Sequence, residues 1–128
     1  MGFARMILLI QLLALASLGL AYFLRPHEMS NLSGMLLLAP AAVTEVRAYY
    51  GGLQLGLAAY MLLALLRPEL LRGALTLLVL LYSALALARI GGLWLDGGAQ
   101  QTFNLAALLL EAVSAGLAYW ALRVLARL

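Results

Sequence analysis

The ten residues from Glu45 to Gln54 read E-V-R-A-Y-Y-G-G-L-Q, and the chain on both sides of them is mostly Leu, Ala and Gly. The stretch places a carboxylate, a guanidinium, two phenols and an amide in apolar surroundings. Such groups cost free energy there unless they are paired or functional. We therefore predict that residues 43–66 form a membrane helix whose polar side chains meet protein rather than lipid.

The composition around this stretch is that of a membrane protein. Of the 128 residues, 66% are hydrophobic and 10% are charged, whereas a soluble domain carries about 25% charged residues. The net charge of +3 comes from arginines at segment ends, which is not the basic patch of a nucleic-acid-binding protein. With no cysteine and one histidine, His27, the chain lacks the residues for disulfides, thiolate catalysis or a multi-histidine metal site.

Four apolar runs divide the chain, each close to the roughly 20 residues that cross a bilayer as a helix. The expected helices cover about residues 4–24, 43–66, 69–92 and 101–126. Residues 67–69 (R-P-E) make a tight turn, and the glycine pairs at 91–92 and 97–98 unwind the chain. The predicted fold is an all-α integral membrane four-helix bundle with antiparallel up-down neighbours, forming a single domain over residues 1–128.

The arginines predict the orientation. Most of them fall at the ends of segments on the N-terminal side of the membrane: Arg5, Arg67, Arg72, Arg123 and Arg127. Because positively charged residues stay cytoplasmic, we expect both termini in the cytoplasm. The long connection at 25–42 and the turn at 96–101 then lie on the opposite side.

Polar residues occupy two opposite faces of the second helix at 100° per residue. One face carries Glu45, Tyr49, Gly52, Gly56 and Tyr60, and the other carries Arg47, Tyr50 and Gln54. The Gly52 and Gly56 spacing predicts close approach by another helix. An interfacial pair of Glu45 and Arg47 that reaches to water is the alternative to a buried role for these two charges.

Arg89 and Glu111 form the second polar feature. Glu111 lies about 15 Å along the last helix, near the bilayer midplane, where a charge costs roughly 2.5–3.5 kcal/mol. Helical side chains lean toward their own N-terminus, so Arg89 on the third helix and Glu111 on the antiparallel fourth lean toward each other. We predict that Glu111 is ionised and paired with Arg89 inside the bundle. The alternative for Arg89 is a position among the outer headgroups.

Together these residues predict an intramembrane polar pocket that opens to the non-cytoplasmic side. Its expected ligand-binding residues are Glu45, Arg47, Tyr49, Tyr50, Gln54, Arg89, Asn104 and Glu111. No catalytic spacing is present, and neither a metal nor a cofactor is predicted.

The segment E-V-R-A-Y-Y-G-G-L-Q-L-G-L, residues 45–57, resembles the signature of a bacterial family of small four-helix membrane proteins of unknown function. The resemblance extends to residues 89–97 and to Glu111. That family is distantly similar to the DoxX-like tetraspan proteins, some of which are tied to quinone or redox systems and others to accessory roles. The resemblance implies a bacterial inner (plasma) membrane protein, the four-helix fold and these polar residues, and it implies no reaction.

Three classes of function follow from these residues. The first is a binding or accessory protein that holds a small amphipathic molecule, such as a lipid or quinone, with guanidinium groups on its headgroup. The second is a dimeric, proton-coupled small-molecule transporter with Glu111 as the coupling carboxylate. The third is a membrane enzyme in which a tyrosine beside Arg47 and Glu45 transfers protons. A purely structural role for the charges is also open, and membrane lipids are expected partners in every case.

Overall fold

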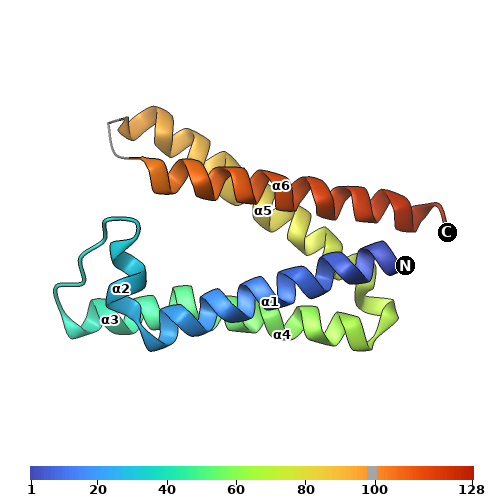
Figure 1. The fold of residues 1–128 in the computed structure, drawn as a ribbon, viewed down its shortest axis with the longest axis horizontal. Helices are drawn as coiled ribbons and strands as arrows, with labels where there is room; N and C mark the ends of the chain where they lie inside the picture. Colours follow the sequence, from blue (N-terminus) through green and yellow to red (C-terminus); the bar gives the residue numbers. More distant parts are fainter. Residues whose placement is uncertain (98–100) are drawn as a thin grey trace. The chain divides into compact units, whose positions relative to one another are not determined.

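The computed structural model describes residues 1–97 and 101–128, and this part of the chain is helical, with no strand. Four helical segments are long and apolar enough to cross a membrane: Gly2–Leu24, Pro40–Leu66, Pro68–Asp96 and Thr102–Ala126. Figure 1 shows their course. The prediction of an all-α fold with four membrane-spanning helices is confirmed by the helical content and by the length and apolar composition of these segments.

A short helix follows the first span, and a π-helical turn interrupts the second span. Helix α1 (Gly2–Leu24) is followed by the short α2 (Pro26–Asn31). The second span combines α3 (Pro40–Val46), a π-helical turn η1 (Arg47–Gly52) and α4 (Leu53–Leu66). Pro40 lies in the first turn of α3, where its missing N–H leaves no hydrogen bond unmade.

The third span begins with a 3₁₀ turn, η2 (Pro68–Leu70), and continues as α5 (Leu71–Asp96), and α6 (Thr102–Ala126) is the fourth. The prediction that the glycine pair at 91–92 unwinds the chain was wrong, because α5 runs through both glycines to Asp96. Packing and the helical hydrogen bonds outweigh the cost of about 1 kcal/mol per helical glycine. Gly97, with φ of 53°, caps the helix, and the predicted break at Gly98 lies outside the described residues.

The chain divides into two compact units. The first unit contains residues 1–7 together with 68–128, and the second contains residues 8–67. Helix α1 therefore contributes its first turns to one unit and the rest to the other.

In the first unit, α5 and α6 run antiparallel as a helical hairpin (Figure 1). Small and branched side chains are fully buried along it, including Ala74, Leu78, Ala118 and Ala121. Arg72 donates from Nη2 to the carbonyl of Leu125 at 3.3 Å, so this carbonyl near the C-terminal end of α6 accepts both from Arg72 and from the Leu128 N–H. Many large apolar side chains stay exposed, such as Leu87 at 69% and Leu109 at 66%, as expected for a lipid-facing surface.

In the second unit, α1 packs against η1 and α4 through glycines. A Cβ atom added to Gly51 would lie 3.1 Å from the backbone nitrogen of Phe23, and one on Gly19 would lie 3.0 Å from the Gly51 carbonyl oxygen. Gly52 and Gly56 take no part in this contact, since within the described part of the second unit a Cβ on Gly56 would meet nothing within 4 Å, and the close approach of another helix to this pair stays a prediction. The reason is that α1 packs on the face that carries Arg47, on which Gly51 follows one turn later.

Candidate functional site

An ion pair between Arg89 and Glu111 joins α5 to α6. The Arg89 Nε donates to Glu111 Oε1 at 2.7 Å, and the glutamate side chain is only 9% exposed. A charge-assisted bond of this length is among the stronger hydrogen bonds in proteins. The pairing predicted from the lean of the two side chains is confirmed.

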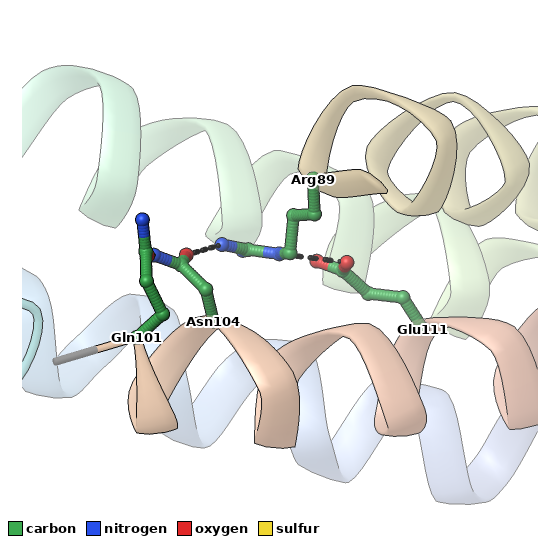
Figure 2. Close-up of polar contacts among 4 residues, drawn as sticks. All are labelled: Arg89, Gln101, Asn104 and Glu111. Carbon is green, nitrogen blue, oxygen red and sulfur yellow. Dashed lines mark hydrogen bonds and ion pairs between the residues drawn. The ribbon is translucent and has the colours of Figure 1, made fainter. Parts of the chain in front are cut away.

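The polar contacts extend from Arg89 toward the α5–α6 connection. Arg89 Nη1 donates to Asn104 Oδ1 at 2.7 Å, and Asn104 Nδ2 donates to Gln101 Oε1 at 2.6 Å. Gln101 Nε2 donates in turn to the Gly97 carbonyl at 3.2 Å. In Figure 2 the four side chains point toward one another between the two helices. We call Arg89, Gln101, Asn104 and Glu111 the Arg89 network.

Helical spacing explains why these groups meet. Gln101 and Asn104 are three residues apart, and Glu111 follows Asn104 after seven, so all three project from one side of α6. Gln101 was not among the predicted site residues. The sequence places Gln101 at the start of the expected helix 101–126, three residues before Asn104, and this spacing was the available signal.

The network leaves part of the guanidinium open. An arginine side chain has five N–H groups, and only two of those on Arg89 donate to described residues. Its side chain is 27% exposed. Because Glu111 and Asn104 fix the plane of the group, the remaining N–H groups form a preoriented set of donors.

Arg47 has a different environment, in the second unit. Its Nη1 donates to the Phe23 carbonyl at 3.0 Å, and its Cζ lies 5.6 Å from the centre of the Phe23 ring. The carbonyl belongs to the last turn of α1, where carbonyls lack helical partners and a positive charge is favourable. Arg47 therefore caps α1 through the Phe23 carbonyl. Within the described part of the chain it makes no ion pair with Glu45.

Replacing Arg47 with Leu should remove this cap and lower the free energy of unfolding by about 1 kcal/mol. This value is below the usual contribution of a hydrogen bond to a charged group, because the contact is exposed to solvent. Lysine should recover only part of the loss, since it lacks the planar group that stacks on Phe23. Thermal denaturation in detergent measures both. Equal melting of wild type and Arg47→Leu would show that the cap contributes nothing.

The other predicted residues of the second span lie near Arg47. The Tyr50 ring is 5.2 Å from that of Tyr22, and Gln54 Nε2 donates to the Tyr50 carbonyl at 2.6 Å. Glu45 is exposed, and Tyr49 is 64% exposed. These residues belong to the second unit and the Arg89 network to the first, so the single pocket containing both sets stays a prediction.

A cavity of about 250 Å³ is present in the first unit, away from the Arg89 network. It lies where η2, the start of α5 and the end of α6 meet, and its lining is Met1, Pro68, Glu69, Leu71, Arg72, Leu125 and Leu128. Among the residues that the structure describes, no group of three or more His, Cys, Asp or Glu side chains is placed to hold a metal ion. The Arg89 N–H groups that donate to no described residue are candidate binding groups.

Four helices that are long and apolar enough to cross a membrane, with a charge pair nearly buried between two of them, indicate a small multi-pass membrane protein. The chain belongs to the family described as "Domain of unknown function (DUF4345)", whose model matches residues 3–122. The comparison with curated proteins and the comparison with solved structures each found no match.

Proposed function

We propose that the protein binds a small amphipathic molecule, such as a lipid or a quinone, through the Arg89 network. The observation that supports this proposal is a guanidinium held at 2.7 Å by each of two side chains while its remaining N–H groups donate to no described residue. A helix charge pair that served only packing would gain nothing from a preoriented donor set on a side chain that is 27% exposed. The apolar surface of the spans suits the tail of such a ligand, and the donors suit its headgroup.

Arg89→Lys tests the proposal, because lysine keeps the charge beside Glu111 but lacks the planar set of N–H groups. Purified full-length protein in maltoside detergent is titrated with decyl-benzoquinone and, separately, with 4-decylbenzoate. The fraction that survives heating is read by size-exclusion chromatography. We expect at least one probe to protect wild type saturably and Arg89→Lys at least tenfold less effectively.

Arg123→Lys is the matched control, since Arg123 is an exposed arginine on α6 whose hydrogen bond and cation–π contact are both with Tyr119 and not with the network. It should respond like wild type. If neither probe protects wild type, or if both lysine variants respond like wild type, binding by the network is refuted. The transporter and enzyme hypotheses have no separate observation in their favour and stay predictions.

The orientation proposed with this function places both termini in the cytoplasm of a bacterial inner membrane. Arginine placement at the segment ends supports it. Reporter fusions at Leu128 should be active only in their cytoplasmic form, and a fusion within residues 32–38 only in its translocated form. A translocated reporter at Leu128 would reverse the topology.

A further inference from the structure

The charges around the open donors of Arg89 determine which headgroup suits them. Glu111 Oε1 lies 2.7 Å from the Arg89 Nε and neutralises the guanidinium. The pair is therefore dipolar, with no net charge. Asn104 and Gln101, which complete the network, add none.

The next charged residue on α5 adds a negative charge. Asp96 follows Arg89 by seven residues, on the same side of the helix and about 10 Å along it. Among the described residues of the first unit, no second cation bonds to the network, so in this unit the charge is zero at Arg89 and Glu111 and negative toward the α5–α6 connection.

We infer that the ligand of this site has an uncharged carbonyl headgroup and is not an anion. An anion at the open N–H groups would place a second negative charge beside Glu111 in a medium of low dielectric, where charges interact strongly and an unbalanced charge is costly. A neutral carbonyl accepts the same N–H donors and adds no charge. This inference rests on the proposed function and specifies its ligand class.

The two probes of the binding assay differ in the charge of the headgroup. Decyl-benzoquinone presents neutral carbonyls and 4-decylbenzoate presents a carboxylate, on tails of equal length. The chain has no cysteine with which a quinone would react. We expect wild type to bind the quinone with an apparent Kd at least tenfold lower than that of the benzoate.

Glu111→Gln, a replacement of nearly equal shape, tests the cause of the preference. It leaves the guanidinium charge without its carboxylate, so the affinity for the benzoate should rise at least tenfold over wild type. Glu69→Gln, at the other end of the first unit and outside the network, is the control and should keep the wild-type preference. If Glu111→Gln fails to fold, the preference of wild type for the quinone over the benzoate alone tests the inference.

The outcomes separate the two proposals. If wild type binds the benzoate more tightly and Arg89→Lys abolishes that binding, the protein binds amphiphiles but the neutral-headgroup inference is overturned. An unchanged preference in folded Glu111→Gln overturns it as well. If neither probe binds in a manner that depends on Arg89, both the proposed function and this inference fail.

Discussion

Arg89→Leu should lower the free energy of unfolding by about 3–5 kcal/mol, the usual result of leaving one member of a buried ion pair without its partner. The uncompensated group is then Glu111, whose side chain is only 9% exposed. Glu111→Leu should cost less, because Arg89 is 27% exposed and keeps its bond to Asn104. The loss should therefore be unequal in the two single variants.

The double variant Arg89→Leu/Glu111→Leu should recover much of the larger loss, since an apolar pair of similar size replaces a buried ion pair at little cost. Denaturation of all four proteins in detergent gives the coupling energy of the pair. Additive losses would show that the bond contributes no coupling. A matched pair of variants, Arg123→Leu and Glu69→Leu, should change stability little, because Arg123 and Glu69 are both exposed.

Gly51→Leu is expected to have the second large effect. Even a Cβ atom would lie 3.1 Å from Phe23 and 3.2 Å from the Gly19 carbonyl oxygen, and the backbone atoms among these contacts cannot move aside as a side-chain end does. Overpacking typically costs about 1–3 kcal/mol and occasionally more. A leucine at this contact should force α1 away from η1, so the loss should reach or exceed the upper end.

Gly56→Leu is the matched control, five residues further along the same span. Within the described part of the second unit a Cβ there meets nothing within 4 Å, and leucine is the better helix former by almost 1 kcal/mol. Melting in detergent should therefore be lowered in Gly51→Leu and unchanged or raised in Gly56→Leu. If Gly56→Leu were the less stable of the two, the helix contact that stabilises the protein would lie on the Gly52–Gly56 face predicted from the sequence.

The spans and the Arg89–Glu111 pair could be predicted because their signals are local. Hydropathy and length determine which segments can cross a membrane. A lone charge deep in a helix calls for a partner, and antiparallel neighbours let Arg89 and Glu111 lean together. In both cases the side chains that make the feature are themselves visible in the sequence.

The contacts of Arg47 and Gly51 could not be predicted in the same way. A projection at 100° per residue separates the Arg47 face from the Gly52 face, but it does not say which of them α1 meets. The partner of Arg47 is a backbone carbonyl, at Phe23, and every residue has one, so no sequence pattern marks it. The ligand-binding role of the predicted residues stays a prediction for a related reason, since the chain's own atoms do not reveal what else they bind.

The position of the charge pair on consecutive spans bears on how the protein is made. Arg89 leaves the ribosome 22 residues before Glu111, so α5 reaches the insertion machinery with an unpaired guanidinium. Arg89 lies seven residues before the end of α5 at Asp96, so this charge costs at most the value of about 2.5–3.5 kcal/mol that insertion scales give for the centre of a helix. Lateral release of α5 into lipid is thus favoured once α6 has emerged, and the two helices should leave the translocon together as a hairpin.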